Sequence, residues 1–254
     1  MSEALLLACI ASFLAGLVDA MAGGGGLIQL PALLALMPEA SLATVLGTNK
    51  GAAVWGTSVA FVRYARVVPL PWRSVGLAAA AAGIASAIGA IMARSVATET
   101  LKPVVLVALV GVAIFTFVKP DFGKIARGVE RPAVAAALGA VIGLYDGMVG
   151  PGTGTFLIVA FIATLGLDFL AANAAAKGVN AATNFAAVAM FAASGNVRWA
   201  WSLPMAVANM AGGYLGARFA LAHGSAWVRR VFQVVIVALI AKVAWDFTAS
   251  LQSG

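Results

Sequence analysis

The sequence contains a single cysteine, a single histidine and few charged residues. Cys9 alone cannot form an internal disulfide, so cysteine usage leaves the redox compartment open. His223 stands beside an expected loop, and the chain has no His-Glu-x-x-His or Gly-x-Ser-x-Gly motif. We therefore expect a protein that is not an enzyme and that has no catalytic residues, metal site or cofactor.

The shortage of charge indicates the solvent in which the chain folds. Only 10% of the residues are charged and 63% are hydrophobic, and the mean hydropathy is +1.02. A soluble domain has about 25% charged residues, so we expect an integral membrane protein surrounded by a lipid bilayer. The net charge of +7 comes from Lys and Arg residues that stand mostly between hydrophobic runs. Membrane topology accounts for that placement, and nucleic-acid binding is not expected.

The hydrophobic runs differ in length, and the difference is informative. They cover about residues 4–22, 26–37, 42–62, 74–93, 101–118, 133–149, 155–167, 169–193, 199–221 and 228–248. Most can cross roughly 30 Å of hydrocarbon as a helix. Runs 26–37 and 155–167 reach only about 18 Å at 1.5 Å per residue. Each is expected to be a half-helix after a break, in a broken helix or a re-entrant hairpin.

The two short runs belong to a repeated pattern. Asp19-Ala-Met-Ala-Gly-Gly-Gly-Gly26 returns 127 positions later as Asp146-Gly-Met-Val-Gly-Pro-Gly-Thr-Gly154, and the same offset pairs Lys50 with Lys177. We therefore expect an all-α membrane protein, a polytopic helical bundle built from two homologous repeats. The repeats would cover residues 1–118 and 133–254, joined by a basic cytoplasmic linker at 119–132.

The positions of the basic residues bear on topology. They cluster at Arg63, Arg66 and Arg73, in the linker, and at Arg229 and Arg230. All three clusters face the cytoplasm if each repeat crosses an odd number of times, as three helices plus a re-entrant hairpin or as five helices. That arrangement makes the repeats inverted. Four crossings per repeat, with parallel copies, remain an alternative.

The glycines have two expected roles. Gly139, Gly143 and Gly147, like Gly212 and Gly216, have the spacing that lets helices pack closely. Four glycines in a row and a Gly-Pro-Gly instead weaken a helix at several positions together, so they are expected to break it.

Charged residues inside the apolar runs are the strongest sign of a site. Lys50 and Lys177 lie inside such runs, and Asp19 and Asp146 precede the two breaks. A Lys or Asp near the bilayer centre costs about 2.5–3.5 kcal/mol on insertion scales, so these residues usually pair or face a cavity. One interpretation is a structural Asp–Lys pair in each half, without a role in transport.

The other interpretation is an anion site. Half-helices beginning at Leu27 and Thr155 would direct unsatisfied N–H groups and positive dipole ends at the breaks, where the two lysines converge on one electropositive cavity. Gln29, Asn173 and Asn184 are further neutral donors in these runs. Asp19 and Asp146 would carry a coupling proton or Na⁺. The expected substrate-binding residues are Gly23, Gly24, Gly25, Gly26, Thr48, Asn49, Lys50, Gly150, Gly152, Thr153, Gly154, Lys177 and Asn180.

The stretch of residues 19–34, the Gly-Thr-Asn-Lys-Gly of 47–51 and the Gly-Pro-Gly-Thr-Gly of 150–154 together resemble the TauE/SafE family of sulfite exporters. The resemblance covers essentially the whole chain and is to the branch with a Thr-Asn-Lys motif. It implies a multi-pass protein of the bacterial inner membrane that carries sulfite, sulfonates or sulfoacetate by secondary transport linked to a proton gradient. The second half departs from the pattern, with Ala175-Ala176-Lys177 where Thr48-Asn49-Lys50 stands.

Two other functions fit the same residues. Broken helices and buried lysines also serve passive anion channels. A cation or metabolite exporter would instead use the aspartates as ligands and the lysines as their partners. A homodimer is the default expectation for the oligomeric state.

Overall fold

The computed structural model describes residues 3–93 and 128–252. Within these ranges the chain forms α-helices and no strand. The helices are α1 (Glu3–Ala22), α2 (Gly26–Leu36), α3 (Leu42–Ala65), α4 (Trp72–Met92), α6 (Pro132–Met148), α7 (Thr153–Leu165), α8 (Phe169–Ala193) and α9 (Trp199–Gln252). The all-helical class expected from the sequence is confirmed.

The helix bounds follow the hydrophobic runs closely. The span labelled α9 consists of two helical segments that meet at a sharp kink at Gly224, where φ is 74° and ψ is −174°, and they correspond to runs 199–221 and 228–248. The run 101–118 and most of the expected linker 119–132 lie outside the described residues.

The two glycine-rich stretches end one helix and begin another. Gly23 and Gly24 have φ of 80° and 89°, and Gly150 and Gly152 have φ of 90° and 86°. This left-handed region is accessible to glycine at little cost, so the chain can turn sharply after α1 and after α6. The short helices α2 and α7 follow, as expected.

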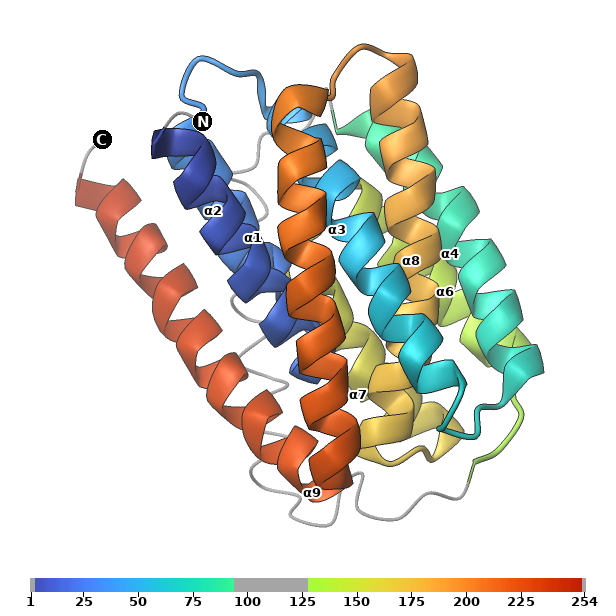
Figure 1. The fold of residues 1–254 in the computed structure, drawn as a ribbon. Helices are drawn as coiled ribbons and strands as arrows, with labels where there is room; N and C mark the ends of the chain where they lie inside the picture. Colours follow the sequence, from blue (N-terminus) through green and yellow to red (C-terminus); the bar gives the residue numbers. More distant parts are fainter. Residues whose placement is uncertain (1–2, 94–127, 253–254) are drawn as a thin grey trace.

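Each short helix forms a hairpin with the helix before it, and the two hairpins open at opposite ends of the bundle (Figure 1). The N-terminus and the loop after α2 lie at the top of this view, whereas α6 starts and α7 ends at the bottom. Backbone hydrogen bonds from Gly128 to Gly166 and from Val129 to Leu165 hold the lower end together. The long helices α3 and α8 lie side by side and run in opposite directions.

Small residues allow the helices to pack at close range. A Cβ placed on Gly139, Gly143 or Gly147 of α6 would collide with backbone atoms of α4 at Ala78, Ala82 and Ser86. Gly212 and Gly216 of α9 are pressed in the same way against the α1 backbone. The close-packing role expected for these glycines is therefore observed, because any larger side chain would separate the helices.

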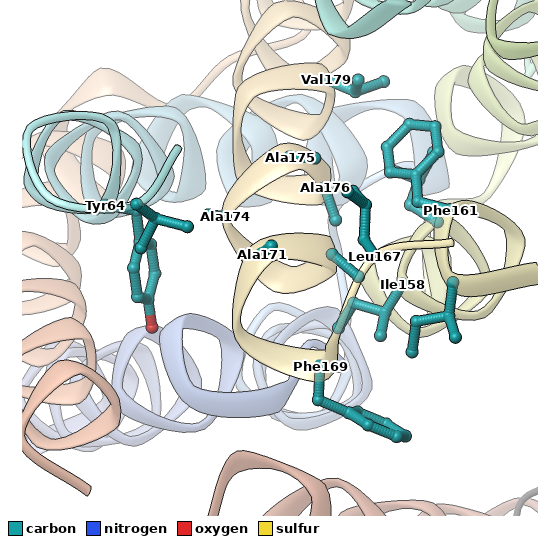
Figure 2. Packing of buried hydrophobic residues seen from close by; sticks show 14 of the residues in the cluster. Tyr64, Ile158, Phe161, Leu167, Phe169, Ala171, Ala174, Ala175, Ala176 and Val179 are labelled. Carbon is teal, nitrogen blue, oxygen red and sulfur yellow. The ribbon is translucent and has the colours of Figure 1, made fainter. Parts of the chain in front are cut away.

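Aromatic and aliphatic side chains fill the lower core around α7 and α8. Figure 2 shows Phe161, Phe169 and Tyr64 among alanines of α8. The ring of Phe169 also meets that of Phe232, with centroids 5.2 Å apart. This packing positions α8, which carries Lys177.

The outer surface is apolar as well. Val141, Val207 and Phe185 are 71%, 69% and 69% exposed, which is unusual for large apolar side chains in water but normal in lipid. By length and composition, α1 and α4 are each able to cross a membrane. Helices α3 and α8 are less apolar because polar residues are buried on their inner faces.

Glu130, just before α6, caps the first turn of α4. Its carboxylate accepts hydrogen bonds from the Ser74 hydroxyl and from the N–H groups of Ser74 and Arg73. The Ser74 side chain is the main cause that lowers the pKa of Glu130, and the two backbone donors and the Arg73 charge act in the same direction.

We expect Glu130→Gln to lower the melting temperature at pH 7. Because the folded-state pKa of Glu130 lies below its unfolded value of about 4.3, its contribution is present above that pH and is lost as pH falls through the folded pKa. Differential scanning fluorimetry should therefore show the two proteins converging below about pH 4. Glu39→Gln, in an exposed loop, is the control, and an equal effect of both variants would contradict the cap.

Candidate functional site

The tips of the two hairpins touch inside the bundle. A Cβ placed on Gly23 would lie 2.8 Å from the carbonyl carbon of Gly154 and 2.8 Å from the nitrogen of Thr155. On the other side of this contact, a Cβ on Gly26 would lie 3.6 Å from the Cα of Pro151. Position 23 thus requires glycine for two reasons: its left-handed backbone conformation and its close contact with the backbone of the other hairpin. The two glycine breaks therefore pack directly against each other.

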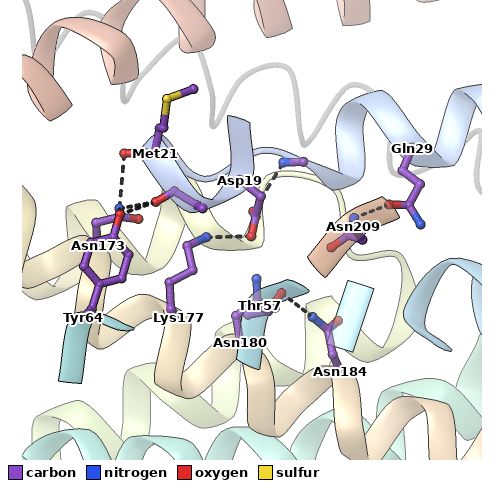
Figure 3. A network of polar contacts seen from close by, with 12 residues as sticks. Asp19, Met21, Gln29, Thr57, Tyr64, Asn173, Lys177, Asn180, Asn184 and Asn209 are labelled. Atoms are coloured by element: carbon purple, nitrogen blue, oxygen red, sulfur yellow. Dashed lines mark hydrogen bonds and ion pairs between the residues drawn. The ribbon is translucent and has the colours of Figure 1, made fainter. Parts of the chain in front are cut away.

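At the end of α1, the glycine break leaves carbonyl groups without N–H partners from the helix, and side chains of other helices donate to them instead. The Asn173 amide donates to the carbonyls of Ala20 and Met21 at 2.7 and 3.2 Å, and the Tyr64 hydroxyl donates to Ala20 at 2.6 Å. Figure 3 shows Asn173 and Tyr64 together at this helix end. Broken helices survive at membrane depth only when such groups are satisfied, so Asn173 supports the break and does not line the cavity described below.

The N-termini of the short helices differ from those of α3 and α8. Ser41 caps α3 and Asp168 caps α8 by accepting a hydrogen bond from a first-turn N–H group. At α2 and α7 the N-cap residues are Gly25 and Gly152, which have no side chain to cap the helix. At α2 the Asp19 carboxylate accepts a long hydrogen bond, 3.4 Å, from the Gly25 N–H. The positive ends of these two helix dipoles are therefore open to a ligand.

A buried cavity lies where these ends meet. About 40 Å³ of it accepts a water-sized sphere, which is room for roughly three waters or one small anion at about 10–15 Å³ per water. Its lining comes from both hairpins and from α3, α8 and α9. The lining residues are Ala15, Asp19, Gly24, Gly25, Gly26, Gln29, Leu30, Asn49, Lys50, Ala53, Thr57, Asp146, Gly150, Pro151, Gly152, Thr153, Gly154, Asn180, Asn184 and Asn209.

Two ion pairs cross between the halves of the chain. Lys50 Nζ of α3 lies 2.6 Å from Asp146 Oδ2 of α6, and Lys177 Nζ of α8 lies 2.7 Å from Asp19 Oδ2 of α1. Lys177, Asp146 and Lys50 are 0%, 1% and 3% exposed. The sequence suggested pairs within each half, whereas each lysine reaches the aspartate of the other half.

These pairs change the electrostatics expected from the sequence. Two ammonium groups balance two carboxylates, so the four side chains together are formally neutral. Lys50 lines the cavity beside Asp146, but Lys177 lies behind Asp19 and is not part of the lining. The positive character of the cavity therefore depends on the helix dipoles and on the ammonium group of Lys50.

Amide side chains surround the ion pairs. Asn209 of α9 donates to Gln29 Oε1 at 3.0 Å and to the Ser12 carbonyl at 2.8 Å, and Asn184 donates to Thr57 at 3.5 Å (Figure 3). Asn49 is 7% exposed and its Oδ1 has no hydrogen-bond partner within the described part of the chain. The cavity thus offers neutral polar groups that can orient a ligand.

Most residues expected at the site line this one cavity. Gly23, Thr48 and Lys177 do not. Gly23 packs against Gly154, and Lys177 pairs with Asp19. The Thr48 hydroxyl donates to the Thr44 carbonyl and accepts from the Arg198 N–H, so it ties α3 to the loop before α9.

Sequence reasoning missed Asn209, Thr57 and Ser12. Asn209 lies in the middle of the apolar run 199–221, so the criterion that selected the lysines would also have selected it. Thr57 and Ser12 carry no such signal, because hydroxyl residues in transmembrane helices usually bond to their own backbone.

Comparison with known proteins identifies the family to which the chain belongs. The family model described as "Sulfite exporter TauE/SafE" matches residues 8–243. A probable membrane transporter protein, ORF9 of Sinorhizobium sp., is 32% identical over 96% of this chain and 93% of its own length. The probable membrane transporter protein YfcA of Escherichia coli K12 is 31% identical over 92% of this chain and 87% of its own length.

A probable membrane transporter protein of Haemophilus influenzae is 29% identical over 95% of this chain and 94% of its own length. No solved structure matches the chain. The apolar surface, the broken helices and the buried charges agree with the transporter names of these relatives. The chain is therefore a membrane transporter that belongs to the TauE/SafE family.

Proposed function

We propose that this protein is a secondary transporter that moves a small anion across the bacterial inner membrane. The substrate class is a sulfur-containing oxyanion or a small organosulfonate, such as sulfite or sulfoacetate. The family description names sulfite, and the volume of the cavity suits an anion of that size. The anion would lie between the first turns of α2 and α7, beside Lys50, Asn49 and Asn180.

One observation carries the proposal. Two helix N-termini without side-chain caps open into the same buried cavity as a lysine. N–H groups and a positive dipole end favour an anion, and an ammonium group at 3% exposure adds charge where solvent screening is weak.

We further propose that the chain consists of two inverted repeats. The starts of α2, α3 and α4 precede those of α7, α8 and α9 by 127 positions, which is the offset of the sequence motifs. The ion pairs Lys50–Asp146 and Lys177–Asp19 exchange under the same offset. The opposite directions of the two hairpins in Figure 1 support inversion. Multiple crossings of the inner membrane, with the basic clusters in the cytoplasm, follow from this arrangement.

A cation or metabolite exporter is the second candidate, because Asp19 and Asp146 both line the cavity. Each carboxylate already has a lysine partner, and a cation would have to displace an ammonium group. An anion at Lys50 would likewise have to displace a carboxylate, so the ion pairs do not separate the two candidates. The two helix N-termini at the cavity favour the anion.

Transport assays with purified protein in liposomes test the proposal. We expect saturable uptake of radiolabelled sulfite or methanesulfonate, driven uphill by a pH gradient, with protein-free liposomes as the control. Flux that never saturates and never runs uphill would indicate a channel. Thermal stabilisation by Na⁺ or other cations, with none by sulfite, sulfonates, sulfate or carboxylates, would contradict an anion substrate.

A further inference from the structure

We propose that Asp146 takes up one proton when an anion binds to Lys50, while the Lys177–Asp19 pair stays closed. This inference rests on the proposed function and deepens it, because it assigns the coupling step to one of the two aspartates. It also sets the ratio of protons to monovalent anions at one.

The ratio follows from the charges. The cavity and the residues that contact it contain two lysines and two aspartates, all in ion pairs. A monovalent anion would leave one negative charge in excess in a buried space. Uncompensated charge in such a place is costly, and ionisable groups respond by neutralising. One proton on a carboxylate restores neutrality, so the anion and the proton would move together.

The contacts single out Asp146 as the group that is protonated. Within the described residues, Lys50 is the one charged or hydrogen-bonding partner of the Asp146 carboxylate. An anion that binds Lys50 therefore removes the partner of Asp146. Asp19 instead has two partners, Lys177 at 2.7 Å and the Gly25 N–H at 3.4 Å. Because Lys177 is fully buried behind Asp19, an anion in the cavity cannot reach it.

The backbone explains this difference between the halves. Gly24 has φ of 89°, and Gly25 then has φ of −54° and directs its N–H at Asp19. The corresponding residues are Pro151 and Gly152. Proline cannot adopt a positive φ, so the turn uses Gly152 instead, with φ of 86°. The Gly152 amide consequently has a different orientation, and Asp146 lacks the hydrogen bond that Asp19 has.

Among residues 3–93 and 128–252, few other titratable groups surround Asp146. Helix α7 contains none, α4 contributes only Arg73 in its first turn, and α8 contributes only Lys177. On α6 itself, the neighbouring Tyr145 donates its hydroxyl proton to the Pro151 carbonyl. Asp19 on α1, which lines the same cavity, is thus the competing site for the proton.

Isothermal titration calorimetry in buffers of different ionisation enthalpy counts the protons taken up on binding. Methanesulfonate is the probe, because it stays ionised throughout the accessible pH range. We expect uptake of about one proton per bound anion for the wild type and no uptake for Asp146→Asn. The matched variant Asp19→Asn/Lys177→Gln removes the other pair whole, so the remaining charges stay balanced, and we expect it to take up about one proton. Asp146→Asn should also bind methanesulfonate equally well at acidic and alkaline pH. Uptake that disappears in Asp19→Asn/Lys177→Gln and persists in Asp146→Asn would overturn the proposal.

A second measurement, infrared spectroscopy, compares Asp146→Asn with Asp19→Asn. If Asp19→Asn does not fold because Lys177 loses its partner, Asp19→Asn/Lys177→Gln takes its place. Infrared difference spectra recorded during acidification detect carboxyl protonation directly, without a bound anion. Exposed carboxyl groups also protonate on acidification, so the diagnostic signal is the C=O band of a buried carboxyl. That band should be absent in Asp146→Asn and present in Asp19→Asn, and the reverse would overturn the assignment. If the wild type binds no anion, the proposed function fails, and the infrared spectra still decide which aspartate is protonated.

Discussion

Lys50→Met is expected to abolish anion transport and to lower the free energy of unfolding by about 3–5 kcal/mol. The variant leaves the Asp146 carboxylate, 1% exposed, without its partner at 2.6 Å. An unpaired buried charge is responsible for most of this loss of stability. The loss of transport has a separate cause, since Lys50 is the one ammonium group that lines the cavity within the described residues. Flux in liposomes and unfolding in denaturant measure the two effects.

The double variant Lys50→Met/Asp146→Asn separates structure from function. Neutral residues of similar size commonly restore the stability that is lost when one partner of a buried pair is removed. We expect the double variant to recover most of its stability and none of its transport. The matched control is Lys177→Met/Asp19→Asn. It should keep measurable flux because Lys177 does not line the cavity and an asparagine at position 19, which does line it, remains polar. Wild-type flux in Lys50→Met/Asp146→Asn would leave that pair with a structural role only.

Gly23→Ala is expected to cause the second large effect, a loss of roughly 2–5 kcal/mol in stability together with the loss of transport. The left-handed conformation of Gly23, with φ of 80°, costs a residue with a Cβ about 1–2 kcal/mol. The added Cβ would also lie 2.8 Å from backbone atoms of Gly154 and Thr155. These backbone atoms cannot avoid the clash by a rotamer change, as a side chain could. Overpacking of the contact between the hairpins therefore costs about 1–3 kcal/mol. The hairpins would have to separate at the cavity.

Gly195→Ala is the control that isolates the contact between hairpins. Gly195 has a similar φ of 73°, and a Cβ there meets nothing within 4 Å. It should therefore lose only the conformational part of the stability and keep full transport. Equal unfolding curves for Gly23→Ala and Gly195→Ala would show that the two breaks are not packed against each other.

The sequence was sufficient for the helices and for most of the residues that line the candidate cavity. Long apolar runs specify helices in a membrane, because only a helix satisfies their backbone groups locally. The short runs after glycines specified α2 and α7 for the same reason. The buried lysines and aspartates were recognisable because a charge inside an apolar run needs a partner or a cavity. Among the polar residues of the site, Asn209 could have been found in this way.

The partners of these charges were decided by the tertiary structure alone. The repeat in the sequence suggested a lysine and an aspartate for each half, but equivalent positions are as consistent with pairs inside a half as with pairs between halves. The hairpins enter the bundle from opposite ends, which brings Asp146 to Lys50 and Asp19 to Lys177.

Composition and spacing by themselves determined that this chain is a helical membrane protein with charges buried beside two breaks, because these properties depend on the cost of placing each residue in lipid. The tertiary structure decided that the charges neutralise each other across the halves and that, of the two buried lysines, Lys50 lines the cavity and Lys177 does not. Distances between residues far apart in the sequence depend on how the helices pack, and local patterns do not contain that information.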